Sequence, residues 1–264
     1  MIFLHFLDKT AKIETEFYME KRKIMLDIMD LHTHTIVSGH AYNTRNEMIQ
    51  AAEGKGLEIY AVTEHAPAMP GSCRNMYFVN YKVLPRKHGD MAVLYGAELN
   101  ILDFAGRVDL PESILRDMDL TLASIHMPCY VSGTAKENTD AYVGAMKNPY
   151  INIIAHPDDG RFPIDYERLV KAAREYHVIL EVNNASLAPG SFRGNPRDKY
   201  QEMLELCKIY QVPVVMDSDA HADVQVGSHE LAQEMLDLAG FPEELVVNSS
   251  REILKEYINK GYLL

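Results

Sequence analysis

Short apolar runs alternate with longer segments of helical periodicity along most of the chain. The runs rich in β-branched residues are interpreted as seven strands: Leu26–Leu31, Glu58–Thr63, Met91–Ala97, Asp119–Ser124, Ile151–Ala155, Val178–Val182 and Val212–Asp217. Strands that alternate with helices are typical of βα units arranged around a parallel sheet. The pattern therefore predicts an α/β fold.

The segments between these runs carry apolar residues on one helical face. In Arg197–Tyr210, for example, Met203, Leu206, Cys207 and Tyr210 follow the i, i+3, i+4, i+7 spacing of a helix that packs on one side. Further helices are expected at Thr44–Lys55, Asp165–Tyr176, Ser228–Gly240 and Ser250–Gly261. Because no Pro/Gly-rich linker interrupts this series, one domain is expected.

Residues 1–24 are rich in charge and precede the first predicted strand. Two interpretations remain open. The segment is an appended helix, or it is an extension read from an upstream start codon, with the working protein beginning near Met19 or Met25. The apolar run Ile2–Leu7 lacks the basic start and the cleavage site of a signal peptide. We therefore divide the chain into an N-terminal extension, residues 1–24, and a domain, residues 25–264.

The charge balance of the chain restricts its partners. It has 26 Lys and Arg against 38 Asp and Glu, a formal net charge of −12, which disfavours binding to nucleic acid or to an anionic membrane. No apolar run reaches the length of about 20 residues that a membrane helix needs. The three cysteines, Cys73, Cys129 and Cys207, form no CxxC pair, which favours a reducing compartment. A cytoplasmic location is expected.

Each predicted strand ends in a polar side chain that can bind a metal ion or a substrate. Taking the first such residue of each unit, at 32, 65, 98, 126, 156, 183 and 219, the successive differences are 33, 33, 28, 30, 27 and 36. This is the length of a βα repeat. In a closed or nearly closed parallel barrel, the carboxyl ends of the strands meet on one face. Seven of the 11 histidines, those at 32, 34, 40, 65, 126, 156 and 221, would then share one cleft.

A metal site explains such a cluster better than burial alone. Neutral imidazoles beside Glu98 and Asp219 would be costly to bury without a partner for their lone pairs, and divalent ions supply one. His32 and His34 lie two apart on an extended chain, so their side chains point the same way, and Asp219 and His221 repeat this arrangement. Asp217 is a candidate acceptor behind them. The remaining histidines, His5, His88, His177 and His229, are expected to be structural.

Several short motifs together resemble one known family, the PHP (polymerase and histidinol phosphatase) superfamily, and within it the YcdX-like phosphatases. The matching segments are DLHTHT (30–35), SGHAY (38–42), TEH (63–65), GAELN (96–100), SIH (124–126), AHP (155–157), EVNNAS (181–186) and DSDAH (217–221). The resemblance covers about residues 27–255. It implies a distorted (β/α)7 TIM-like barrel and a metal-dependent hydrolase domain with a trinuclear metal centre.

The resemblance also implies which residues hold the three divalent ions, most often Zn²⁺, with Mn²⁺ or Fe as other occupants. Three sets are implied: His32, His34, Glu98 and Asp219 on one ion; Glu98, His126 and His156 on the second; His40, His65 and His221 on the third. Glu98, Asp219 and His65 are taken as the catalytic residues. The chain departs from the family pattern at Glu64, where the family usually has Asp. This difference concerns the residues that support the ligands, not the ligands themselves.

A phosphatase reaction follows from this interpretation. A water between two divalent ions becomes a hydroxide nucleophile near neutral pH and would attack the phosphorus of a phosphomonoester. Arg161, Arg193 and Asn183 are candidate substrate contacts, although a solvated loop position is the favoured interpretation of both arginines. The expected partner is a small-molecule phosphoester rather than a nucleic acid or a membrane. The sequence leaves a homo-oligomer open.

Three alternatives to a general phosphatase remain. Histidinol-phosphate phosphatase is a sister branch of the superfamily with similar ligands. A phosphodiesterase or nuclease is disfavoured because the chain is acidic and lacks a basic stripe with interleaved aromatic residues. A non-catalytic metal-binding module is disfavoured because all nine ligand positions carry the expected residue type.

Overall fold

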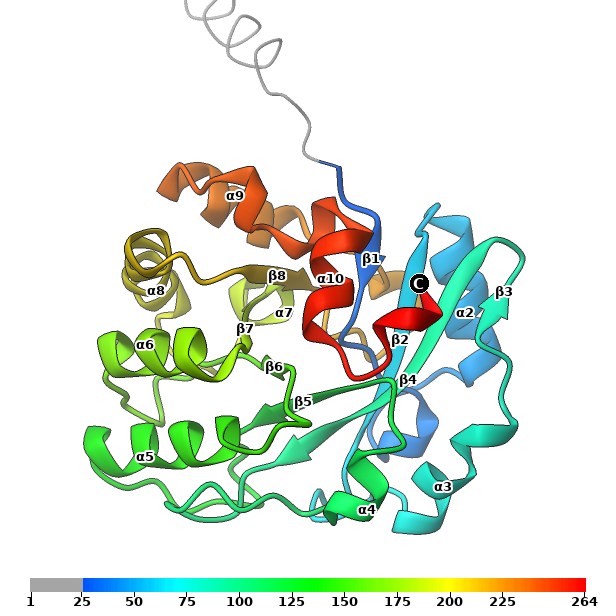
Figure 1. The fold of residues 1–264 in the computed structure, drawn as a ribbon, viewed down its shortest axis with the longest axis horizontal. Coiled ribbons are helices and arrows are strands. Elements are labelled where there is room, and N and C mark those ends of the chain that lie inside the picture. Colours follow the sequence, from blue (N-terminus) through cyan, green and yellow to red (C-terminus); the bar gives the residue numbers. More distant parts are fainter. Residues whose placement is uncertain (1–25) are drawn as a thin grey trace, which may run out of the picture.

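The structure is a computed structural model, and it describes residues 26–264; the predicted extension at residues 1–24 lies outside the described residues. Seven parallel strands follow one another in a single sheet, in the order β1-β2-β4-β5-β6-β7-β8 (Figure 1). They are β1 (Met29–Asp30), β2 (Ile59–His65), β4 (Met91–Asn100), β5 (Leu120–Ser124), β6 (Ile153–Ile154), β7 (Ile179–Asn183) and β8 (Val214–Asp217). The sheet curls until its two edge strands approach each other, which gives the predicted (β/α)7 barrel.

Helices surround the barrel (Figure 1). The α-helices are α2 (Arg45–Gly54), α3 (Asn75–Val79), α4 (Glu112–Leu115), α5 (Ala135–Met146), α6 (Tyr166–Tyr176), α7 (Asn184–Leu187), α8 (Pro196–Tyr210), α9 (Glu230–Ala239) and α10 (Arg251–Tyr257). Short 3₁₀ turns join them: η1 (Ile36–Ser38), η2 (Asn80–Val83), η3 (Asp223–Gln225), η4 (Glu243–Leu245), η5 (Val247–Ser249) and η6 (Gly261–Leu263). Within residues 26–264, no helix combines the length and the hydropathy needed to cross a bilayer.

All seven predicted strands are present, although β1, β5, β6 and β8 are shorter than expected and β2 and β4 are longer. Strand β3 (Lys87–His88), which pairs antiparallel with β4, was not predicted, because two residues are too few to show a pattern. The short helices α3, α4 and α7 were not predicted either, since one or two turns carry little periodicity.

Among the described helices, α5 is the one long helix that the sequence analysis missed. It begins at a capping box: the Thr134 hydroxyl accepts from the backbone N–H of Glu137, and the Glu137 carboxylate accepts from the Thr134 N–H at 2.8 Å. Because Ser or Thr followed three residues later by Glu is a helix-start signal, this helix was predictable.

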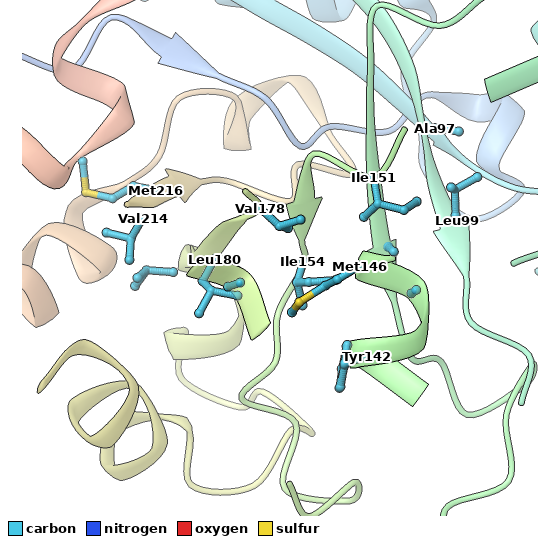
Figure 2. Close-up of a cluster of buried hydrophobic side chains, with 14 of the residues drawn as sticks. Ala97, Leu99, Tyr142, Met146, Ile151, Ile154, Val178, Leu180, Val214 and Met216 are labelled. Atoms are coloured by element: carbon cyan, nitrogen blue, oxygen red, sulfur yellow. The ribbon is translucent and has the colours of Figure 1, made fainter. Parts of the chain in front are cut away.

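One apolar layer lies between the outer face of the sheet and the helices. Figure 2 shows part of it, where Ile154 of β6 and Leu180 of β7 lie near Met146 of α5. Tyr142, one turn before Met146, is also buried there. Because the strands are buried on both faces, their residues are almost continuously apolar, as is usual for parallel strands covered by helices.

A second apolar cluster fills the inside of the barrel, and the C-terminal segment closes the end where the strands begin. Leu254 and Ile258, from α10 and the residue after it, pack against the inward-facing side chains of the strands. Polar contacts fix this segment to the starts of the strands. The Asn152 side chain donates to the Tyr257 carbonyl (2.8 Å), and the Lys260 backbone donates to the Asp119 carbonyl (3.2 Å). This end is thus sealed, and the opposite end, where the strands finish, carries the polar residues.

The barrel is not closed by a regular ladder between β1 and β8. A single parallel bridge joins Thr33 to Ala220. The side chain of Asn248 replaces missing backbone pairs: it accepts from Met216 N (2.7 Å) and donates to the carbonyls of Met29 (3.1 Å) and Met216 (2.8 Å). This seam positions the two strands whose ends carry His32, His34, Asp219 and His221.

Candidate metal centre

The nine predicted ligands come together at the carboxyl ends of the strands. His65 ends β2 and Glu98 lies in β4, while the others lie in the segments that follow η1, β1, β5, β6 and β8. Their ligand atoms form overlapping triads within 4.8 Å of one another: His32, His34 and Asp219; His32, Glu98 and His156; His65, Glu98 and His126; His34, His65 and His221. Residues from one end of the domain to the other therefore form one cluster.

The Glu98 carboxylate lies at the middle of the cluster, and its two oxygens face different partners. Oε1 lies 3.1 Å from His126 Nε2 and 2.7 Å from His156 Nε2. Oε2 lies 3.4 Å from His32 Nε2 and 3.5 Å from His34 Nε2. Such a division would allow the carboxylate to be shared between two ions.

Asp219 completes the group around Oε2. Its Oδ1 lies 3.3 Å from His34 Nε2 and 3.6 Å from His32 Nε2. The two imidazoles and two carboxylates therefore surround one small space, with distances too long for good hydrogen bonds but suitable for ligands that share an ion.

A third group lies nearer the surface. His40 Nε2 is 3.3 Å from His65 Nε2 and 3.0 Å from His221 Nε2. His65 also presents its other nitrogen, Nδ1, to Glu98 Oε2 at 2.6 Å. The His65 ring thus lies between this outer group and the Glu98 carboxylate.

Buried lone pairs without partners show that the cluster fits metal ions. Among the described side chains, His32 Nε2, His34 Nε2, His65 Nδ1 and Glu98 Oε2 are buried with no hydrogen-bond partner. The 2.6 Å contact between His65 Nδ1 and Glu98 Oε2 lacks the geometry of a hydrogen bond. Buried polar atoms are almost always satisfied, so four such atoms directed into one space indicate a shared ligand. Nitrogen and carboxylate donors in this proportion suit Zn²⁺ and other first-row divalent ions.

The protonation states suit metal binding as well. Burial, together with the neighbouring His65 and His221, lowers the pKa of His40 to about 4, and the same causes hold the pKa of His34 well below its usual value. Their lone pairs are therefore free at neutral pH. Burial raises the pKa of Glu98, but the surrounding histidines, His126 first, outweigh it and keep this pKa well below the ordinary value.

Two of the nine residues have an unusual backbone conformation. His156 (φ 32°) and Asp219 (φ 53°) lie in the left-handed region, whereas the other described non-glycine residues with positive φ, His177 and Gln211, end helices. Such a conformation costs on the order of 1–3 kcal/mol and persists where surrounding contacts enforce it. At His156 the contact is a 2.6 Å hydrogen bond from its backbone N–H to Glu181 Oε2.

Two residues that support the ligands were not predicted. Glu181, buried in β7, places Oε1 2.6 Å from His32 Nδ1. Ser38 Oγ lies 3.0 Å from His34 Nδ1, accepts from the His65 backbone (3.0 Å) and donates to Glu64 Oε2 (2.6 Å). Glu181 could have been suspected, because a carboxylate in the middle of an apolar strand is costly unless it is paired. Ser38 gives no such signal.

Glu64 and Asp217 support the cluster from outside it. Glu64 accepts from the hydroxyl and the backbone N–H of Thr35 (2.5 and 3.0 Å). Its side chain, longer than the Asp that is usual at this position, thus holds the segment that leads to His40. Asp217 accepts from Leu31 N across the seam at 2.7 Å. Asp217 was expected to support the histidines, but its described bond is to the backbone of the segment after β1.

The three candidate substrate contacts lie beside the cluster. Asn183 donates to Asp219 Oδ2 (3.2 Å) and to Glu181 Oε2 (3.1 Å). The Arg193 guanidinium is buried and donates to the same Asp219 oxygen (3.1 Å), so it is not a solvated loop residue. Arg161 is exposed at the edge of the adjoining cavity and pairs with Asp159 through Nε and Nη2.

The histidines expected to be structural lie outside the cluster, except that His5 falls outside the described residues. His88 is exposed beside Glu53, and His177 ends α6. His229 is buried, with Nδ1 2.7 Å from Asp27. It joins the start of α9 to the segment before β1.

The barrel, with its cluster of histidines and carboxylates at the carboxyl ends of the strands, is that of a PHP domain protein. The PHP domain model matches residues 30–187, more than half of the chain, so the chain belongs to this family, as the motifs predicted. The narrower resemblance to the YcdX-like branch stays a prediction.

Several sequence relatives of the chain are named probable phosphatases. The chain is 41% identical to a probable phosphatase of Clostridium novyi, over 89% of this chain and 96% of the relative. It is 44% identical to a probable phosphatase of Caldicellulosiruptor bescii, over 85% of this chain and 92% of the relative. A crystal structure of histidinol phosphate phosphatase from Lactococcus lactis, complexed with zinc, L-histidinol and phosphate, has a TM-score of 0.58 at 16% identity, covering 82% of this chain and 95% of that chain. This structural likeness supports the fold.

Proposed function

We propose that the protein is a metal-dependent phosphatase that hydrolyses phosphomonoesters at a centre of three divalent ions, with zinc as the main occupant and manganese or iron as others. The observation that carries the proposal is the Glu98 carboxylate, whose two oxygens face separate groups of histidines. Relatives more than 40% identical over most of the chain are named probable phosphatases. The proposed sets are those implied by the motifs, with Glu98 shared between two of them.

Divalent ions in this cluster would lower the pKa of a water and neutralise charge on the phosphoryl oxygens. In the proposed reaction, the water oxygen forms a bond to phosphorus and the ester P–O bond breaks. The leaving alkoxide takes up a proton, so the products are an alcohol and inorganic phosphate.

The protein's own residues hold the charges in place for this reaction. The low pKa of Glu98 keeps its carboxylate ionised at neutral pH. Asp219 is held by Arg193 and Asn183, which both donate to Oδ2 and leave Oδ1 directed at His32 and His34. His65 directs Nε2 at the outer group, where His40 lies, and Nδ1 at the Glu98 carboxylate. Arrangement of charges before the reaction is the largest contribution expected in phosphoryl transfer.

The test is to count metal ions and measure hydrolysis on one preparation. We expect about three ions per chain by elemental analysis, hydrolysis of 4-nitrophenyl phosphate, loss of this activity after chelation, and its recovery with Zn²⁺ or Mn²⁺. Activity that persists after all metal is removed would contradict the proposal, and a fully active enzyme with a single ion per chain would contradict the three-ion centre.

The same preparation tests two of the alternative functions. Faster hydrolysis of bis(4-nitrophenyl) phosphate than of 4-nitrophenyl phosphate would favour a phosphodiesterase. A metal-loaded protein that cleaves neither ester would favour a metal-binding module without catalysis.

A further inference from the structure

A large cavity opens beside the metal cluster. It has a volume of about 940 Å³, and His40, His65, His126 and His221 contribute to its lining. Pockets of this size hold molecules much larger than a phosphate group. If a phosphoryl group binds at the cluster, as proposed above, most of the cavity remains for the alcohol part of the substrate, the leaving group.

The charged side chains at the cavity wall are already paired. Arg161 and Arg193 line the cavity, and of the described residues in its wall Asp219 alone carries a carboxylate. That carboxylate belongs to the metal cluster and already pairs with Arg193. Asp159 is close by, but its side chain is only 4% exposed and pairs with Arg161. A positively charged leaving group would therefore find no free carboxylate in the wall to pair with.

The rest of the wall includes large apolar side chains that are open to solvent. Phe192 is 70% exposed and Met127 is 55% exposed, and both line the cavity. The Arg161 guanidinium carbon lies 4.6 Å from the centre of the Phe192 ring. This contact holds a planar cation and an aromatic face together at the cavity wall. In the described contacts of Arg161, Nε and Nη2 bond to Asp159, and Nη1 makes no hydrogen bond.

We propose that the substrates are phosphomonoesters whose leaving group is aromatic and carries no positive charge. This inference rests on the proposed phosphatase function. An aromatic ring would pack against Phe192, Met127 and the face of the Arg161 guanidinium, and the free Nη1 would donate to an acceptor on that ring. Histidinol phosphate, whose leaving group carries an ammonium group, is predicted to be a poor substrate because this group would lose water without gaining a carboxylate partner.

The experiment compares three alkyl phosphomonoesters that differ in the leaving group but are similar in intrinsic reactivity: benzyl phosphate, ethyl phosphate and 2-aminoethyl phosphate. With the metal-loaded enzyme we expect kcat/KM to fall in this order. In Phe192→Ala, the preference for benzyl over ethyl phosphate should drop by roughly 3- to 10-fold, mostly through KM, as expected for the loss of one aromatic contact. Phe104→Ala removes a partly exposed aromatic side chain that does not line the cavity, and it should retain the preference.

The outcomes separate this inference from the function on which it rests. The inference is overturned if the enzyme cleaves these esters but prefers 2-aminoethyl phosphate or histidinol phosphate. It is also overturned if Phe192→Ala keeps the preference for benzyl phosphate. Either result leaves the proposed phosphatase function intact. If no phosphomonoester is cleaved, the proposed function fails. Calorimetric binding of benzylphosphonate and 2-aminoethylphosphonate to the metal-loaded protein then decides on the cavity alone: tighter binding of the benzyl compound supports the inference, and equal or weaker binding overturns it.

Discussion

The carboxylate of Glu181 lies 2.6 Å from Nδ1 of His32, on the opposite side of the ring from the Nε2 that faces Glu98. A histidine that binds a metal through one nitrogen commonly bonds to a carboxylate through the other, which fixes the orientation of the ring and increases its basicity. The second oxygen of Glu181 accepts from the backbone of His156. One buried side chain thus positions two of the proposed ligands.

Glu181→Gln should weaken metal binding while preserving the fold. Loss of such a supporting carboxylate typically reduces metal affinity or activity by about 10- to 100-fold. Competition with a chromogenic chelator measures the affinity, and saturating Zn²⁺ should restore much of the activity. Glu205→Gln, at an exposed position of α8, is the matched control. Equal affinity in Glu181→Gln and in the control would show that the contact with His32 has no role in holding metal.

Glu98→Gln should have a larger effect, because this residue is proposed to be a shared ligand. The amide has one oxygen and no negative charge, so it cannot bridge two ions in the same way. We expect the loss of roughly one to two ions per chain and a fall in kcat of roughly 10³-fold or more, since each metal contributes several kcal/mol to the transition state. Elemental analysis and circular dichroism would separate metal loss from unfolding. A variant with full metal content and full activity would refute the bridging role.

Asn248→Ala should destabilise the barrel at its seam. The Asn248 side chain bonds to the backbones of Met29 and Met216, and its removal leaves buried backbone groups without partners. A cost of about 3 kcal/mol in the free energy of unfolding is expected, measured by urea denaturation. Asn46→Ala, on the exposed surface of α2, should cost much less. If both variants are equally stable, the seam is held by the other contacts between β1 and β8.

His229→Gln should show a stability defect that depends on pH. Burial lowers the pKa of His229, but the hydrogen bond to Asp27 and the nearby carboxylate of Asp30 outweigh it and raise this pKa well above the usual 6.5. A raised pKa in the folded state adds stability that is fully present below the unfolded value and is lost as pH rises through the folded value. The variant should therefore lose about 2 kcal/mol at pH ~6 and less at pH ~9.

The readout for His229 is the difference in the free energy of unfolding between the wild type and the variant at each pH, with both proteins loaded with the same metal. Titration of the metal cluster then affects the stability of both proteins equally and largely cancels in the difference. His88→Gln is the control, because this exposed histidine pairs with Glu53 at the surface. A defect that grows as the pH rises over this range would contradict the assignment of a protonated His229.

Much of the candidate site could be predicted because it follows a repeat. In a parallel barrel every strand ends on the same face, so a ligand placed after each strand reaches the same space whatever the loops do. The meeting of His32, Glu98 and His156 in one space could be predicted in this way from their positions alone. The apolar runs were equally informative, since strands buried on both faces leave little ambiguity.

The supporting contacts could not be predicted, because they join residues far apart in the chain whose partners depend on side-chain direction. Arg193 was expected to be a solvated loop residue, yet the loop folds its guanidinium onto Asp219. The role of Asn248 depends on how far the sheet curls, which no local pattern encodes. The polar residues after each strand were thus enough to predict the order of the candidate ligands around the barrel and the chemistry they share. Which side chains hold those ligands in place, and what lines the cavity beside them, became clear from the folded chain, because both depend on packing between distant segments.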